Sequence, residues 1–373
     1  MRPARIPALF FFLLASNAPG ATFGTVVAPA GGASYSDIVL DQSRSQLYLV
    51  NTAINAVDIY NIKTKLFQTS IQTDTQPVSA ALSRDSRYLY VSAYTAAAVD
   101  VIDLNNGQVI NRITLPTNPE GLAVGADGKV LITAVGTGTA TTNTLLIFDA
   151  PGALAGNGNA LSAVPVPPAA ATPPTLPAPS GRAYNSYRSR LLATPDGKWI
   201  VGVNGTSTTA RVVFLFESAS GSVLRTRSVT NLSTTLAIAP DGSKFMAGPT
   251  LFNAQTLQVM AQENAANAPF AFPATNNFNL QTNQGGSVFS PDGSVIYSAF
   301  DVAPIGAPKP SITELLLNDP DNLLITLGLE MPENLAGKMV IDSAGAGIYA
   351  ISDSGFMILP VSNISQSPIA VPN

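Results

Sequence analysis

The sequence contains no cysteine and no histidine. Without cysteine there can be no disulfide framework and no thiol nucleophile, so the folded chain must be stabilised by packing and strand pairing. Without histidine the chain lacks the usual general base, the commonest zinc ligand and the common pH-sensitive side chain. These absences exclude histidine-containing catalytic triads, cysteine enzymes and the usual zinc sites.

Charged residues are also scarce, at 11% of the chain, whereas hydrophobic residues make up 46%. This composition is too apolar for a disordered chain. The 29 glycines and 29 prolines interrupt the sequence too often for long helices. The short apolar runs between them are rich in Thr, Val, Ser, Asn and Ala, which favours strands and an all-β fold.

The N-terminus has the order of a secretory signal. Arg2 and Arg5 precede an apolar run at residues 8–15, and small residues follow at Ala18, Gly20 and Ala21. We therefore expect residues 1–21 to be a signal peptide and residues 22–373 to be one domain, located in the periplasm, at the cell surface or outside the cell. The run is too short for a permanent membrane helix, so no transmembrane segment is expected after cleavage. A buried strand is the alternative interpretation.

The net charge at pH 7 is −4, and it becomes about −6 when Arg2 and Arg5 are removed with the signal. Nucleic acid and anionic membranes are therefore poor partners for the surface as a whole.

A strand–turn–strand unit recurs along the chain. Its turns are anchored at Ser43, Asp85, Asp127, Asp196, Asp241, Asp292 and Ala344. The successive spacings are 42, 42, 69, 45, 51 and 52 residues. A period in the forties is typical of the four-stranded blade of a β-propeller.

Three of these turns read Pro-Asp-Gly, as at Pro195–Gly197. Proline presets the backbone angle, aspartate hydrogen-bonds its own backbone, and glycine accepts a positive φ. Aspartates recurring at fixed intervals also suggest metal ligands. Because there is one aspartate per unit, turn chemistry explains them better than a ligand cluster.

The unit resembles the YVTN family of β-propeller repeats. The resemblance is strongest at Pro77–Leu115, where Leu89-Tyr-Val-Ser92 and Val99-Asp-Val-Ile-Asp103 stand in the family's order, followed by Pro116 and Pro119. It covers nearly the whole mature chain and weakens in the last three units. The resemblance implies a seven-bladed β-propeller of four-stranded antiparallel blades, commonly in exported or surface proteins. It implies no activity, because the repeat is a scaffold pattern.

Within each unit we expect the strand before the turn to be innermost. An additional strand at Thr22–Ala28 has no unit of its own. We expect it to pair into the last blade and close the ring, which removes the exposed edges of an open sheet. A linker after the signal is the alternative.

Long insertions interrupt the repeat. Residues 151–182 contain eight prolines and predict a polyproline-like surface excursion, either a partner-binding segment or a tolerated insertion. Further long loops lie at 136–143, 261–283 and 301–310. Propeller geometry places all four on one face, opposite the tight turns. Since binding usually involves loops on a rigid scaffold, we expect the site on this long-loop face.

One cluster of candidate binding residues follows the proline-rich insertion and comprises Arg182, Tyr184, Tyr187, Arg188 and Arg190. Arginine offers paired donors to carboxylate or sulfate groups, and tyrosine offers a stacking surface for sugars. Alternatively, the arginines cap loop carbonyls and the tyrosines pack under the insertion. Further single candidates on this face are Tyr94, Glu120, Asn204 and Asp301. Trp199 is expected in the core.

The sequence thus favours a secreted, non-catalytic propeller that binds a protein or polysaccharide partner, with no catalytic residues and no resident cofactor. Two alternatives stay open. Distant carboxylates could converge on calcium at the channel and form a divergent hydrolase or lyase. The chain could also be a structural module of a cell-envelope assembly.

Overall fold

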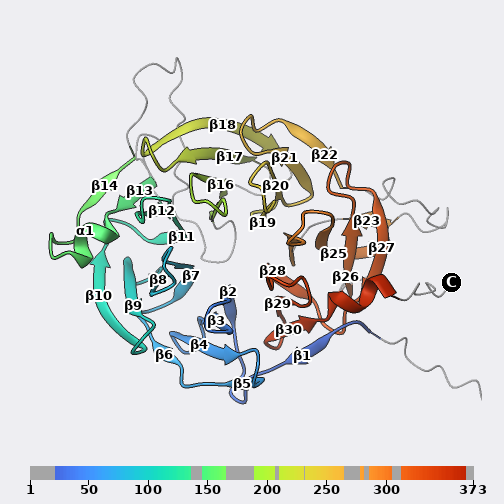
Figure 1. Cartoon of the computed structure of the whole chain (residues 1–373), viewed down its shortest axis with the longest axis horizontal. Helices are drawn as coiled ribbons and strands as arrows, with labels where there is room; N and C mark the ends of the chain where they lie inside the picture. Colours follow the sequence, from blue (N-terminus) through green and yellow to red (C-terminus); the bar gives the residue numbers. More distant parts are fainter. Residues whose placement is uncertain are drawn as a thin grey trace, which may run out of the picture.

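The computed structural model describes residues 22–135, 145–164, 189–205, 210–230, 232–263, 278–280, 285–304 and 312–366. These residues form seven antiparallel sheets. The sheets stand as blades around a central axis, with the strand that precedes the tight turn of each blade nearest the centre (Figure 1). The predicted all-β, seven-bladed propeller is therefore confirmed.

The first four blades follow one another along the chain. Blade 1 contains β2 (Tyr35–Asp41), β3 (Gln46–Asn51), β4 (Ala56–Asn61), β5 (Leu66–Phe67) and β6 (Ile71–Gln72). Blade 2 contains β7 (Pro77–Leu82), β8 (Tyr88–Ala93), β9 (Ala98–Asp103) and β10 (Gln108–Thr114). Blade 3 contains β11 (Pro119–Val124), β12 (Val130–Ala134), β13 (Leu145–Phe148) and β14 (Leu161–Ala163). Blade 4 contains β15 (Arg190–Ala193), β16 (Trp199–Gly205), β17 (Ala210–Glu217) and β18 (Ser222–Thr230).

The other three blades complete the ring. Blade 5 contains β19 (Leu236–Ile238), β20 (Lys244–Ala247), β21 (Thr250–Asn253) and β22 (Val259–Gln262). Blade 6 contains β23 (Phe278–Leu280), β24 (Gly286–Phe289), β25 (Ile296–Pro304), β26 (Ile312–Asn318) and β27 (Ile325–Glu330). Blade 7 contains β28 (Leu335–Ile341), β29 (Ile348–Ser352), β30 (Phe356–Leu359) and the N-terminal strand β1 (Thr25–Val27). The extra strands in blades 1 and 6 are second segments, since β5 and β6 both pair with β4, and β23 and β24 both pair with β25.

The N-terminal strand closes the ring as expected. Strand β1 pairs antiparallel with β30, with Val27 opposite Phe356. Blade 7 thus takes its outer strand from the beginning of the chain and its other three strands from the end. This pairing covers the outer edge of β30 and joins the last blade to the first part of the chain.

The hydrophobic core is divided among the joints between blades. In the described residues, each pair of neighbouring blades shares one buried apolar cluster, from the blade 1–2 joint around to the blade 7–1 joint. Because both faces of a blade are covered, the middle strands are buried along most of their length. Strand β8 is buried at every position. Trp199, expected in the core, is half-buried and packs against the blade 4–5 cluster.

The tight turns have the predicted chemistry. The Oδ1 atom of Asp85 accepts the Ser83 hydroxyl at 2.5 Å and the Arg87 N–H at 3.1 Å. Gly197 and Gly293 have φ values of 70° and 73°, where an L side chain is strained. The recurring aspartates therefore serve the turns.

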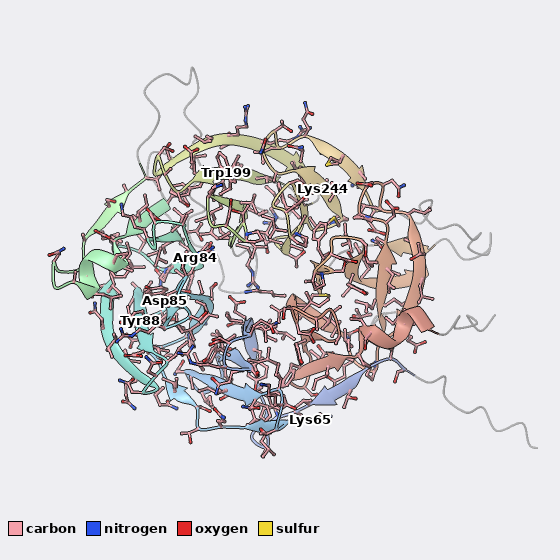
Figure 2. The ribbon with its side chains drawn as sticks, in the orientation of Figure 1. Lys65, Arg84, Asp85, Tyr88, Trp199 and Lys244 are labelled. Carbon is pink, nitrogen blue, oxygen red and sulfur yellow. The ribbon has the colours of Figure 1, made fainter. Side chains whose placement is uncertain are left out.

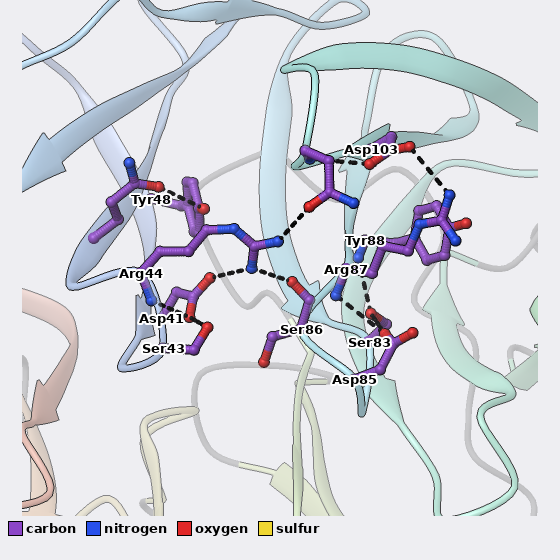
Figure 3. Close-up of polar contacts among 12 residues, drawn as sticks. Asp41, Ser43, Arg44, Tyr48, Ser83, Asp85, Ser86, Arg87, Tyr88 and Asp103 are labelled. Atoms are coloured by element: carbon purple, nitrogen blue, oxygen red, sulfur yellow. Dashed lines mark hydrogen bonds and ion pairs between the residues drawn. The ribbon is translucent and has the colours of Figure 1, made fainter.

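An arginine ties the first two turns together (Figure 3). The Nη1 atom of Arg44 lies 2.9 Å from Asp41 Oδ2 and donates to the Ser86 carbonyl at 2.5 Å. The same guanidinium donates through Nη2 to Asn105 at 2.8 Å. This contact joins blade 1 to blade 2 on the tight-turn face.

The first part of the expected insertion at residues 151–182 has regular secondary structure and belongs to blade 3. A short helix, α1 (Ala150–Leu154), is followed by β14, which pairs with β13 as the fourth strand of blade 3. Asp149 caps the helix by accepting the Gly152 N–H at 3.2 Å, and proline at its first turn is compatible with a helix start. Residues 165–182 lie outside the described part of the chain.

Candidate functional site

One position of the repeat recurs around the central channel. It lies six residues before each turn anchor and is occupied by Asp37, Ser79, Gly121, Arg190, Thr235, Gly286 and Lys338. Each blade supplies one of them, at or near the start of its inner strand. Asp37, Ser79, Arg190, Thr235 and Lys338 line one small cavity together. We refer to these five residues as the polar layer.

Asp37 is the most buried charge of the polar layer. Its Oδ1 accepts the Ile38 N–H at 2.8 Å and lies 3.0 Å from the Lys338 ammonium. Its Oδ2 accepts the Ser79 hydroxyl at 2.8 Å and the Ala80 N–H at 2.9 Å. Burial by itself would raise the pKa of Asp37, but the charges of Lys338 and Arg190 and the Ala80 hydrogen bond together lower it to about 2.

Arg190 extends across the channel from blade 4 to blade 1. Its two terminal nitrogens lie 3.5 and 3.4 Å from the Ser36 carbonyl oxygen on β2. The cavity at this level has a volume of only about 30 Å³, enough for one or two water molecules. The polar layer therefore narrows the channel.

Two other predicted residues meet beside Arg190. The Oε2 atom of Glu120 on β11 accepts the Ser189 N–H at 2.9 Å. The Ser189 hydroxyl donates to the Asn204 side-chain oxygen on β16 at 3.1 Å. All three residues are buried. These contacts fix the chain just before Arg190, so Glu120 and Asn204 position the start of β15.

The remaining predicted residues are not brought into this group. Tyr94 is half-buried in the loop between β8 and β9, where its carbonyl oxygen accepts the Asn118 amide at 2.7 Å. Asp301 belongs to β25, but its side chain lies outside the described residues. Arg182, Tyr184, Tyr187 and Arg188 also lie outside them, so their role stays a prediction.

Sequence reasoning missed a large cavity on the tight-turn side of the channel. It has a volume of about 500 Å³ and is lined mainly by apolar side chains of β15, β19, β24 and β28. Its rim lies on the tight-turn face and includes Pro195, Pro240 and Pro291, the prolines of three Pro-Asp-Gly turns. Arg84, labelled in Figure 2, occupies the equivalent position in blade 2. Its guanidinium donates to the Pro195 carbonyl at 2.5 Å. Each of these prolines lies one residue before its turn anchor. This shared position is the sequence signal that could have pointed to the rim.

Among the described residues, no group of three or more Asp, Glu, His or Cys side chains is arranged to hold a metal ion. None of the described helices has the length and hydropathy of a membrane span.

The geometry defines a seven-bladed β-propeller, and solved structures agree. No protein-family profile and no curated protein matches the chain. The hydrazine synthase of Kuenenia stuttgartiensis is similar over 91% of this chain and 99% of its own, with a TM-score of 0.62 and 16% identity. The β-propeller domain of Cps50 (Swd1) from Myceliophteria thermophila covers 90% and 99%, with a TM-score of 0.61 and 12% identity. The WD40 repeats of RRP9 cover 91% and 99%, with a TM-score of 0.61 and 10% identity. At these identities the similarity shows the fold alone.

The polar layer leads to a prediction at acid pH. Since the pKa of Asp37 is about 2 in the folded state and 3.8 ordinarily, its stabilising effect is complete above about pH 5 and is lost as the pH falls toward 2. The shift corresponds to about 2 kcal/mol. We expect Asp37→Asn to remove this part of the acid dependence, measured by urea unfolding between pH 5 and pH 2. Asp353→Asn, in an exposed turn, is the control; an unchanged acid profile in Asp37→Asn would contradict the assignment.

Proposed function

We propose that the protein is an exported, non-catalytic propeller that binds a protein or glycan partner through its long-loop face. The observation that carries the proposal is the grouping of Arg190, Glu120 and Asn204 at the beginning of β15, the end of an inner strand that faces the long loops. Rigid strands that carry polar side chains to a loop-bearing face are a common basis for binding.

The chemistry of this face suits a ligand with carboxylate or sulfate groups. Arginine donates two parallel hydrogen bonds to such groups, and tyrosine supplies a flat surface for a sugar ring or an apolar side chain. Arg190 and Tyr94 are the described representatives of these two residue types. The predicted residues at 182–188 would extend the same surface.

The structural comparisons are compatible with a scaffold role. One of the similar structures consists of WD40 repeats, whereas another is named as an enzyme. Because one fold hosts both kinds of protein, the choice depends on the site. The chain lacks histidine and cysteine. The carboxylates of the described residues do not gather into a metal-binding group. Both observations favour binding over catalysis. Export is supported by the charge and hydropathy pattern of residues 1–21.

The proposal is tested by measuring binding of the purified mature chain to immobilised sulfated and carboxylated polysaccharides and to soluble envelope proteins. We expect Tyr94→Ala and Arg190→Gln to weaken binding to the partner at least about tenfold, equivalent to about 1.4 kcal/mol. Lys198→Ala, in an exposed turn on the opposite face, is the matched control. If binding were lost in the control and retained in both long-loop variants, the site would lie on the tight-turn face and the proposal would be contradicted.

A further inference from the structure

The cavity on the tight-turn side of the channel has the properties of a small-molecule site. Its volume of about 500 Å³ falls within the range of roughly 300–1,000 Å³ typical of ligand pockets. Its walls include Leu192, Leu236, Ile238, Val288 and Val340, all of which are partly accessible. An apolar molecule in this cavity would remove these side chains from water, which is favourable in proportion to the area covered.

A cation lies where this cavity meets the polar layer. The large cavity and the small cavity of the polar layer share three lining residues, which are Lys338, Leu192 and Leu236. The side chain of Lys338 is 25% exposed, and its ammonium lies 3.0 Å from Asp37 Oδ1. An ammonium has three N–H donors, and Asp37 accepts one of them. Since Lys338 also lines the large cavity, an acceptor that enters there can compete for the remaining donors.

The nearby negative charges are already engaged. Asp37 accepts hydrogen bonds from Ile38, Ser79 and Ala80 in addition to its ion pair with Lys338. Asp342, which lines the large cavity, accepts the N–H groups of Ala346 and Gly347, each at 2.8 Å. Arg190 adds a second cation to the same layer. The inner end of the cavity therefore presents a cation to a ligand, while both carboxylates are held by N–H and O–H donors of the protein.

We propose that this cavity binds an amphipathic anion, a carboxylate carried on an aliphatic chain or an apolar ring. The apolar part would lie against the leucine, isoleucine and valine walls, and the carboxylate would accept hydrogen bonds from Lys338. This site opens on the tight-turn face, and it meets the partner-binding surface proposed above only at the polar layer, where Arg190 lies beside Lys338.

Isothermal titration with three ten-carbon ligands tests the proposal: decanoate, 1-decanol and decylamine, each below its aggregation concentration. We expect decanoate to bind with a stoichiometry of one, 1-decanol to bind at least about tenfold more weakly and decylamine to bind more weakly still. Equal affinity for decanoate and decylamine, or stronger binding of 1-decanol than of decanoate, would overturn the proposal.

Two variants separate the charge from the walls. Lys338→Met keeps a long apolar side chain, and we expect it to reduce the affinity for decanoate about tenfold while leaving 1-decanol unchanged. Because Lys338→Met leaves the Asp37 carboxylate without its cation, Ile238→Glu serves as an independent variant that places a negative charge in the wall and should abolish decanoate binding. Leu224→Glu, at a 44% exposed position on the outer strand β18, is the matched control. Decanoate binding that persists in Ile238→Glu would refute the site.

Discussion

Replacing Glu263 with glutamine is expected to make the protein markedly more stable at pH 8. Glu263 is 4% exposed, and its Oε1 atom has no hydrogen-bond partner, while Asn318 donates to its other oxygen. Burial raises the pKa of Glu263 to about 8 from an ordinary value of 4.5. The carboxyl is therefore largely protonated in the folded protein at neutral pH and ionised in the unfolded chain.

The sign of the effect follows from this difference in protonation. Between pH 4.5 and 8 the folded state holds a proton that the unfolded chain has lost, so the free energy of unfolding falls as the pH rises. The shift corresponds to a loss of up to about 5 kcal/mol across this range. Glutamine does not titrate, and its amide can donate to the Asn318 side-chain oxygen, which has no partner in the wild type.

Guanidinium unfolding at pH 5 and pH 8 measures this prediction. We expect the wild type to lose stability between the two conditions and Glu263→Gln to lose much less. Glu217→Gln, at a half-buried position of β17, should follow the wild type. Equal wild-type stability at the two pH values would show that Glu263 is ionised in the folded protein.

The second large effect is expected from Phe356→Ala, at the joint between the last and first blades. Phe356 is fully buried, and its ring centroid lies 4.9 Å from that of Tyr60 and 6.2 Å from that of Phe67. Removing a buried phenylalanine ring costs about 3–5 kcal/mol, because apolar contacts are lost and a cavity remains. Val27 of the closing strand lies directly opposite Phe356, so the same substitution also weakens ring closure.

Equilibrium unfolding in guanidinium, followed by circular dichroism, tests this substitution. Leu66→Ala removes an apolar side chain that is 65% exposed on β5 of the same joint. We expect this control to change stability by no more than about 0.5 kcal/mol. A loss below about 1 kcal/mol in Phe356→Ala would mean that the site collapses around the missing ring.

Most of the fold was predictable because its signals are local. A proline, an aspartate and a glycine in a row determine a turn from their own backbone preferences. The additional strand expected at Thr22–Ala28 contains β1 (Thr25–Val27), whose residues are all β-branched and favour a strand by themselves. The helix α1 was missed because its alanines, glycine and proline resembled the insertion that follows, and its start depends on the Asp149 cap.

The candidate site was predictable only in part. Arg190 was selected because arginines and tyrosines gather just before it in the sequence. The partnership of Asp37 with Lys338 joins the first blade to the last, and no local pattern reports a contact between such distant segments. Glu263 gave no signal either, because burial of a single carboxylate depends on how two blades pack together.

Closure of the ring by β1 also makes the pairing of β1 with β30 a late step of folding. Strand β1 leaves the ribosome well before its partner β30, because the other six blades lie between them in the sequence. A growing chain can build successive blades, yet β1 has no partner strand until the seventh blade is nearly complete. The final pairing joins residues from opposite ends of the domain, a contact of high sequence separation that slows folding. The last step of assembly is therefore the one that covers the outer edge of β30 and links the two ends of the ring.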